Sequence, residues 1–133
     1  MAEEAVTFII PADPKYAQSL RLLTGGLAHA ANLSFDEVED AKMIAAEAFV
    51  YALSTQQDSV TINFILHDGR FQMVFSLGSL KEEDAGDTIS VAGQDFTTPE
   101  FAKVVMDSLT DSFAVDATNN TLTLEKIARH GQE

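Results

Sequence analysis

The chain has 133 residues, of which 46% are hydrophobic and 22% are charged, and both values are typical of one globular domain. Its 21 acidic and 8 basic side chains give a formal net charge of −13, which repels phosphates and excludes nucleic acid as an expected partner. The absence of cysteine excludes disulfides and thiolate metal sites. The acidic start MAEEAV lacks the features of a signal peptide, and no apolar run approaches the roughly 20 residues of a membrane span. We therefore expect no membrane partner and a cytoplasmic location.

Residues 4–33 predict a strand followed by a helix. The stretch EAVTFIIPA (4–12) alternates apolar side chains with a period of two, which indicates a strand. Segment 13–33 begins with Asp-Pro, an N-cap residue followed by the residue favoured at the first helical position, and then repeats apolar side chains at helical spacing. Gly25 and Gly26 lie inside this helix, where each costs about 1 kcal/mol relative to alanine. Close packing against a neighbour and a simple weak point are the two explanations for this pair.

A second helix is predicted over residues 34–53. Ser34 and Glu37 have the spacing of a capping box, and the acidic residues of the first turn suit the positive end of the helix dipole. Small side chains then recur on one side, so that a sheet or another helix can pack closely on them. This small-residue stripe consists of Val38, Ala41, Ala45, Ala48 and Ala52.

The rest of the chain predicts two hairpins, with a loop and a third helix between them. Alternating strands in 59–77 flank an Asp-Gly pair, which is a strong signal for a two-residue turn. The acidic, glycine-containing segment 78–97 is weakly patterned and is expected to be a loop, with room for one short strand near 88–91. A proline-started helix is predicted over 98–112, and two strands around an Asn-Asn turn are predicted in 113–127.

These elements give the order β-α-α-β-β-α-β-β within one domain that spans residues 1–133. Long antiparallel hairpins combined with three helices predict an α+β fold. We expect a two-layer α/β sandwich, in which a mixed, mostly antiparallel sheet carries the three helices on one face.

Two stretches of the chain are similar to a known family. The first, IPADPKYAQSLRLLTGGLAHAANLSFDEVEDAKMIAAEAFVYAL (10–53), combines Ile-Pro, a proline-aromatic helix start with Arg21, and a second helix that contains Glu-Ala. The second, VMDSLTDSFAVDATNNTLTLEKI (105–127), looks like a closing helix and hairpin. Together they cover about half of the chain and resemble the bacterial anti-sigma-factor serine kinases, which belong to the superfamily of gyrase, heat-shock chaperone, histidine kinase and MutL ATPases. The resemblance implies a histidine-kinase-like ATPase fold, in which 78–97 is a shortened and divergent nucleotide lid.

The resemblance also implies a role for one acidic residue of the second helix. In that family this helix carries Glu-x-x-x-Asn, in which the glutamate activates the attacking hydroxyl or water and the asparagine holds magnesium. Residues four apart share a helix face and can address one phosphate group together. Here Glu47 matches the glutamate, but Tyr51 occupies the asparagine position. A phenol is a poor magnesium ligand, and its ring fills space that metal and phosphates need.

Two further nucleotide motifs of the family are missing. Leu77 lies near the position of the aspartate that pairs with the adenine amino group. Segment 94–103 lacks the glycines whose amides cradle phosphates, and Pro99 removes one such amide. We therefore expect a vestigial nucleotide pocket that is empty or filled by the protein itself. Its expected lining is Glu47, Tyr51, Leu77, Ser79, Thr97 and Thr98.

Loss of three nucleotide contacts predicts a protein that acts by binding. We expect no catalytic residue, no cofactor and no metal, and the three histidines lack the spacing of a metal site. The resemblance implies a non-catalytic regulatory interaction module in a bacterial partner-switching or transcription-regulation pathway. Its partner would be a sigma factor, an anti-sigma antagonist or a sibling subunit, and Arg21 is the candidate partner-binding residue. A homodimer is compatible with the resemblance, because the first strand and helix form the dimer in that family.

Two alternatives remain open at this stage. The first is an active ATP-dependent serine kinase or ATPase with rearranged nucleotide contacts, for which ATP and magnesium are cofactors and Glu47 is the base. The second is a sensor that binds a small molecule in the remodelled pocket beside Tyr51. Binding of ATP with magnesium separates the kinase from the interaction module.

Overall fold

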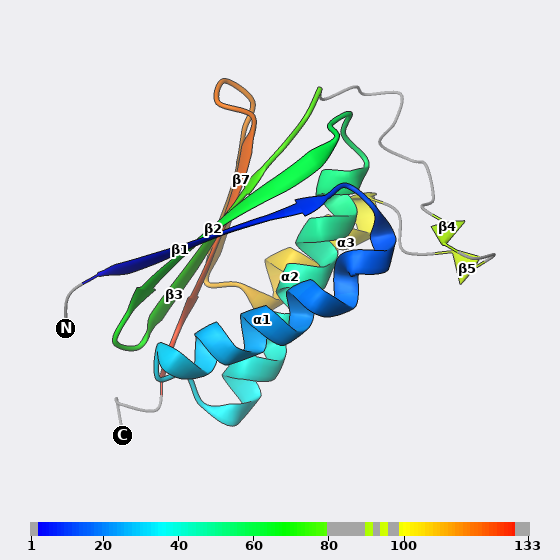
Figure 1. The fold of residues 1–133 in the computed structure, drawn as a ribbon. Helices are drawn as coiled ribbons and strands as arrows, with labels where there is room; N and C mark the ends of the chain where they lie inside the picture. Colours follow the sequence, from blue (N-terminus) through cyan, green and yellow to red (C-terminus); the bar gives the residue numbers. More distant parts are fainter. Residues whose placement is uncertain (1–2, 80–89, 92–93, 96–98, 130–133) are drawn as a thin grey trace.

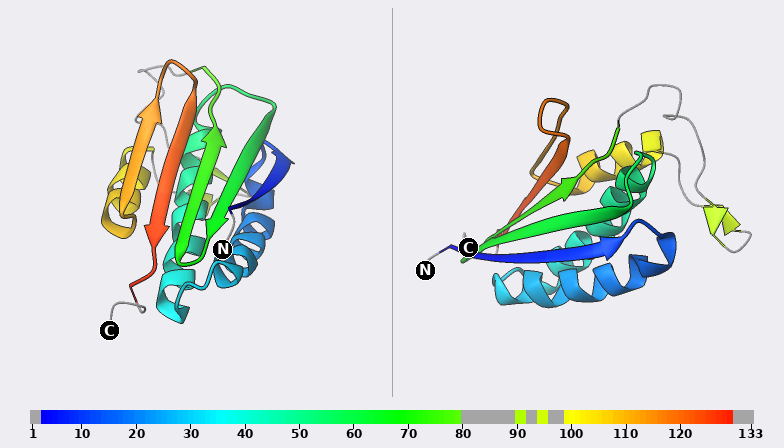
Figure 2. Two further views of the ribbon diagram at one scale, coloured as in Figure 1. Left: turned by 90° about the vertical axis from the view of Figure 1, so that its left-hand side faces the viewer. Right: turned by 45° about the horizontal axis from the view of Figure 1, so that its top comes forward.

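The computed structural model describes residues 3–79, 90–91, 94–95 and 99–129 and consists of two layers, a sheet and a group of helices that covers one of its faces (Figures 1 and 2). The strands of the sheet lie in the order β1-β2-β3-β7-β6, and every neighbouring pair is antiparallel. Their bounds are β1 Glu4–Pro11, β2 Ser59–His67, β3 Arg70–Ser76, β6 Ser112–Asp116 and β7 Thr121–Ile127. The α+β class is confirmed. The expectation of a mixed sheet is wrong for the strands described, because each is joined to its sheet neighbour by an antiparallel ladder.

The helices are α1 (Ala17–Ala30), α2 (Phe35–Leu53) and α3 (Pro99–Leu109), and α2 packs against both of the others. The capping box at its start is confirmed: the Ser34 hydroxyl accepts a hydrogen bond from the Glu37 amide, and the Glu37 carboxylate accepts one from the Ser34 amide. The small-residue stripe is confirmed as a packing face. Its four alanines have no exposed surface, and its valine packs against the core. Small side chains here allow α2 to lie close to its neighbours.

The first helix begins and ends differently from the prediction. Asp13 caps a 3₁₀ turn, η1 (Pro14–Tyr16), and α1 starts only at Ala17. The Asp-Pro signal is the same for both kinds of helix, since each needs an acceptor at the N-cap and tolerates a missing amide next to it. At the other end α1 stops at Ala30, because Asn32 adopts the left-handed conformation with a φ of 67°.

The β2–β3 hairpin supplies much of the core. Gly69 has a φ of 78° in the predicted Asp-Gly turn, and the rings of Phe64 and Phe71 stack with centroids 5.9 Å apart. Alternate side chains of both strands face the helices, as the period of two predicts. The buried ones are Val60, Ile62, Phe64 and Leu66 from β2 and Phe71, Met73 and Phe75 from β3.

Part of the expected lid has a regular structure. Two short strands, β4 (Ser90–Val91) and β5 (Gln94–Asp95), form an antiparallel pair inside the segment predicted as a loop. β4 falls within 88–91, where the sequence left room for one short strand, whereas β5 was not predicted. A two-residue strand gives little sequence signal of its own. The rest of 80–98, including the expected cap of the third helix, lies outside the described residues. At the C-terminal end, the predicted turn between β6 and β7 is confirmed, and Asn120 adopts a φ of 52° in it.

Within the part of the chain that the structure describes, no helix is both long enough and apolar enough to cross a membrane.

Candidate functional site

Glu47 and Tyr51 lie one turn apart near the C-terminal end of α2. Glu47 is half-buried, whereas Tyr51 is only 8% exposed and belongs to the hydrophobic core. The ammonium nitrogen of Lys103, on α3, lies 5.4 Å from the centroid of the Tyr51 ring. This cation–π contact bridges α2 and α3 on the side where the two helices pack. The phenol is therefore a packed side chain held by a neighbouring helix.

Leu77 follows β3 and is buried at the same end of the molecule. Its amide donates a 2.7 Å hydrogen bond to the carbonyl of Asn120, in the β6–β7 turn. The next amide, that of Gly78, donates to the hydroxyl of Thr55 at 2.8 Å, and this hydroxyl in turn donates to the Ala52 carbonyl at 2.6 Å. The buried threonine thus joins the end of α2 to the segment after β3.

Gly78 allows an unusually close approach of two backbone segments. A Cβ atom at this position would lie 1.9 Å from the carbonyl oxygen of Gln56, far inside van der Waals contact. The Ser79 amide donates to the same oxygen at 3.3 Å, and the two residues form an isolated antiparallel bridge. The chain that leaves β3 is therefore fastened directly to the chain that leaves α2.

A second polar group ties the same end together. The side-chain amide of Gln57 donates to the Ser76 carbonyl at 3.0 Å, and the Ser76 hydroxyl donates back to the Gln57 side-chain oxygen at 3.0 Å. The Ser76 hydroxyl also accepts a 2.9 Å hydrogen bond from the Thr61 amide. Sequence reasoning missed this cluster, because a glutamine and a serine 19 positions apart carry no recognisable spacing.

The structure places four of the six expected pocket residues. Tyr51 and Leu77 are buried at one end of the molecule, and Glu47 is half-buried one turn away on α2. Ser79 is exposed, and its amide is engaged with Gln56. Thr97 and Thr98 lie outside the described residues. Arg21, the candidate partner-binding residue, is an exposed side chain of α1.

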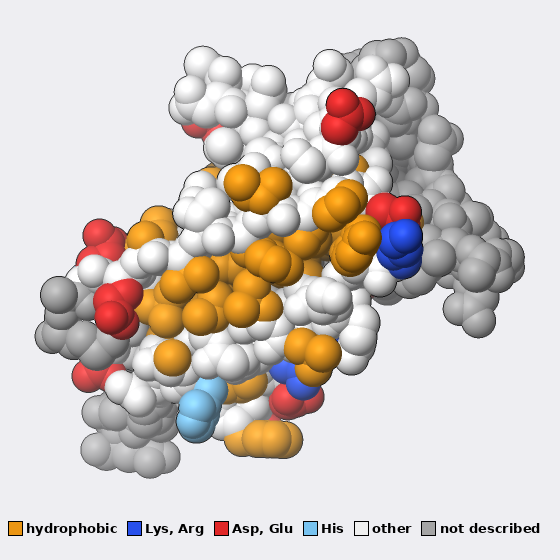
Figure 3. All heavy atoms as spheres, in the orientation of Figure 1, with side chains coloured by type: hydrophobic (Ala, Val, Ile, Leu, Met, Phe, Trp, Pro, Cys, Tyr) orange, Lys and Arg blue, Asp and Glu red, His pale blue; other side chains and the backbone are white. Residues whose placement is uncertain are grey.

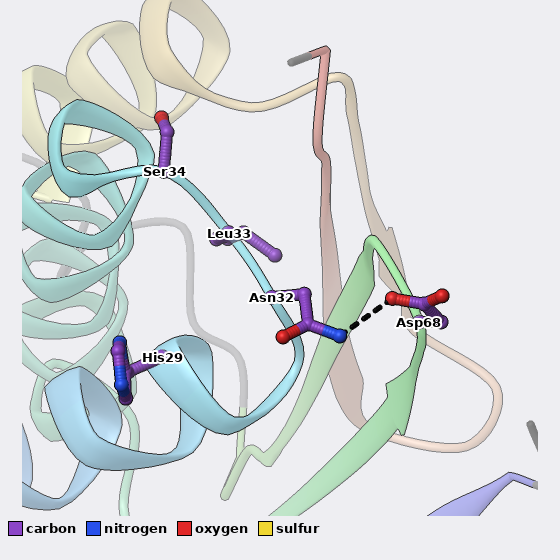
Figure 4. A pocket seen from close by; sticks show the side chains of 5 residues that line it. All are labelled: His29, Asn32, Leu33, Ser34 and Asp68. Carbon is purple, nitrogen blue, oxygen red and sulfur yellow. Dashed lines mark hydrogen bonds between the residues drawn. The ribbon is translucent and has the colours of Figure 1, made fainter. Parts of the chain in front are cut away.

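The opposite end of α2 borders an open depression of about 460 Å³ (Figure 4). It lies where the α1–α2 turn meets the β2–β3 hairpin, and sequence reasoning did not single it out. The Asn32 side-chain amide donates a 2.6 Å hydrogen bond to the Asp68 carboxylate across it, and the Gly69 amide donates to the Ala31 carbonyl at 2.7 Å. Its lining is His29, Asn32, Leu33, Ser34 and Asp68. These contacts join the α1–α2 turn to the β2–β3 hairpin. The Asp68 carboxylate that lines the depression is therefore already hydrogen-bonded to the Asn32 side chain.

An apolar surface runs along β1 and the side of α1. Figure 3 shows this band of hydrophobic side chains in the orientation of Figure 1. Several of its side chains pack against the core on one side and remain partly exposed on the other, because β1 is an edge strand of the sheet. We call this surface the β1–α1 strip and define it by Val6 and Phe8 from β1 and Leu23 and Leu27 from α1.

Comparisons of the chain with models of protein families and with curated proteins found no match. The likeness to anti-sigma-factor kinases is therefore carried by the motifs in the sequence alone and stays a prediction.

Proposed function

We propose that this chain is a non-catalytic regulatory domain that acts by binding another protein, and that it has the histidine-kinase-like ATPase fold without its nucleotide chemistry. The proposed partner is a sigma factor, an antagonist of an anti-sigma factor or a sibling subunit, as in the family that the sequence resembles. One observation carries this proposal. Tyr51 occupies the position expected for a magnesium ligand, and its ring is packed in the core beneath Lys103.

The segment after β3 supports the same proposal. In the family that the sequence resembles, an aspartate at this point reads the adenine base. Here Leu77 is buried, and Gly78 is pressed against the backbone at Gln56. A nucleotide base at this end would have to displace packed side chains and break the hydrogen bonds that join α2 to β3. Binding energy spent on that rearrangement would be lost from the affinity for the nucleotide.

Calorimetric titration with ATP and magnesium tests the proposal. We expect no binding, and a dissociation constant in the micromolar range would contradict the proposal and favour the active serine kinase or ATPase. If the kinase alternative holds, phosphate transfer from ATP to serine should also disappear in the variant Glu47→Gln, because Glu47 is then the base.

The variant Tyr51→Asn sharpens the test. It restores the Glu-x-x-x-Asn pattern, but Leu77 and the glycine-free segment before Pro99 still depart from the family. We expect Tyr51→Asn to leave ATP binding undetectable. Gain of magnesium-dependent ATP binding would mean that the tyrosine alone closes a working nucleotide site, and the proposed binding role would then lose its main support.

A further inference from the structure

The outer edge of β1 is a long strand edge available for pairing. Among the strands that the structure describes, β1 pairs only with β2, over eight residues. The Ala12 amide donates inward to the Asp58 carbonyl at 2.9 Å. Since the backbone groups of a strand alternate between its two edges, the amides of Ala5, Thr7 and Ile9 point away from β2. Pro11 continues this outward set, so its missing N–H costs the sheet no hydrogen bond.

The central residues of β1 themselves carry none of the sequence features that usually block pairing at a strand edge. Natural edge strands are protected by charges, internal prolines, bulges or shortness. The β1 residues from Ala5 to Ile10 carry no charge, and the one proline stands at the end of the strand. The opposite edge of the sheet, β6, is only five residues long and ends in Asp116. Of the two edges, β1 is the better template for an added strand.

Apolar surface lies on both sides of the β1 edge. Side chains at even positions of β1 face the helices and form the β1–α1 strip with Leu23 and Leu27. On the other face of the sheet, Ile9 is 63% exposed. A strand added beside β1 would alternate its own side chains between these two surfaces. Alternate apolar residues would therefore be covered along the strip that Figure 3 shows.

The charges at the ends of β1 favour a basic partner over a second copy. Glu3 and Glu4 stand at its start, and Asp13 and Asp58 stand near its end. His67 lies 3.4 Å from the Glu3 carboxylate, and Lys15, over the ring of Tyr16, offsets part of the charge at the other end. Two β1 strands side by side would bring acids against acids in either direction, and each copy carries a net charge of −13.

We propose that the outer edge of β1 binds an extended segment of a partner protein, with alternating apolar residues and with lysine or arginine at both ends. This inference rests on the proposed protein-binding function and adds the surface and the chemistry of the partner. Backbone hydrogen bonds would supply affinity, the β1–α1 strip would select the apolar side chains, and the acidic ends would select the basic ones.

Selection from a library of random twelve-residue peptides displayed on phage tests the inference. We expect enriched peptides with alternating apolar residues between basic ends. Ile9→Pro, which removes an outward amide but no bond to β2, should weaken their binding about tenfold or more. Its folding is checked by circular dichroism and thermal melting. Glu4→Lys should also weaken binding, whereas Asp107→Lys, an equal change of charge at an exposed position of α3, should not.

Several results would overturn the inference. These are no enrichment, enriched peptides without alternation or basic ends, and equal binding by folded Ile9→Pro. Sedimentation equilibrium provides a further test, because a dimer that Ile9→Pro dissociates would assign the edge to a second copy. The ATP titration keeps the two proposals apart. If neither the peptides nor ATP bind, only this inference is contradicted. If ATP binds, the proposed function is contradicted, and the comparison of Ile9→Pro with the wild type still decides whether the β1 edge binds peptides.

Discussion

Lys103 and Tyr51 hold α3 against α2, with the ammonium nitrogen 5.4 Å from the centroid of the ring. The contact involves an exposed lysine and a ring that is 8% exposed, so one partner remains hydrated while the other is packed. Cation–π contacts with an exposed cation contribute about 0.5–1 kcal/mol. Most of the stabilisation at this point must therefore come from burial of the ring itself.

Substitutions of Tyr51 should separate these two contributions. We expect Tyr51→Ala to lower the free energy of unfolding by about 3 kcal/mol, because it leaves a cavity in the core. Tyr51→Phe keeps the ring and should cost less than about 1 kcal/mol. Urea denaturation measures both values. A loss below about 1 kcal/mol for Tyr51→Ala would show that the ring is not a core side chain. The proposal that this packed ring excludes a nucleotide would then be contradicted.

The two helical glycines of α1 should respond differently to alanine. A Cβ atom at Gly26 would have no neighbour within 4 Å, whereas one at Gly25 would lie 3.0 Å from the side chain of Lys42. We expect Gly26→Ala to raise the free energy of unfolding by about 0.5–1 kcal/mol through helix propensity. Gly25→Ala should gain less, because the lysine must move. Thermal melting of the two variants side by side checks this, and a larger gain for Gly25→Ala would contradict it.

Gly78 should tolerate no side chain at all. Its Cβ atom would overlap the Gln56 carbonyl oxygen at 1.9 Å, so that backbone, and not a flexible side chain, has to shift. We expect Gly78→Ala to cost about 3 kcal/mol or more and to weaken the link between α2 and β3. Ser79→Ala, at the exposed neighbouring position, is the matched control and should change stability by less than about 0.5 kcal/mol. Equal stability of the two variants in urea denaturation would refute the close approach.

The sequence predicted those parts of the fold that depend on local pattern. The structure confirms the capping box at Ser34, the small-residue stripe of α2 and the Gly69 turn. All three follow from residue spacing or from backbone requirements. The 3₁₀ turn at Asp13 could not be separated from a helix start, because both use the same cap. The purely antiparallel sheet was missed, since strand direction depends on pairing between distant segments.

The site was harder to predict than the fold for the same reason. The position of Tyr51 four residues after Glu47 is visible in the sequence, but its contact with Lys103 depends on how α3 packs. Thr55 gives no sign in the sequence that its hydroxyl joins α2 to Gly78. Contacts of this kind join residues far apart in the chain, where no periodicity operates.

Glu37 connects the start of α2 to the C-terminal end of the described chain. One carboxylate oxygen accepts from the Ser34 amide at 2.8 Å, and the other accepts from the Arg129 amide at 2.8 Å. We expect Glu37→Ala to lower the free energy of unfolding by about 1–2 kcal/mol, since a capping interaction and a tether are both lost. Glu37→Gln keeps one acceptor and should cost less. Hydrogen exchange at the Arg129 amide measures the tether directly, and unchanged protection in Glu37→Ala would contradict its role.

Asp116 should make stability depend on pH at the acidic end of the range. Its carboxylate accepts hydrogen bonds from the amides of Asn119 and Thr118 and from the Asn119 side chain, and these bonds, the Asn119 amide foremost, lower the pKa of Asp116 below its usual value. A carboxyl whose pKa is lower in the folded state stabilises the fold above its unfolded pKa, which is about 3.9. That contribution is lost as the pH falls through the folded value.

Nuclear magnetic resonance titration of the Asp116 carboxyl measures this effect, and Asn119→Ala provides the control. The variant removes the side-chain donor of Asn119 but keeps the backbone N–H of that residue. The pKa of Asp116 should therefore rise part of the way toward its usual value. In Asp116→Asn, the loss of unfolding free energy relative to the wild type should be largest above about pH 4 and should shrink below it. A difference that stays constant from neutral to acidic pH would mean that the charged form of this carboxyl contributes nothing to the turn between β6 and β7.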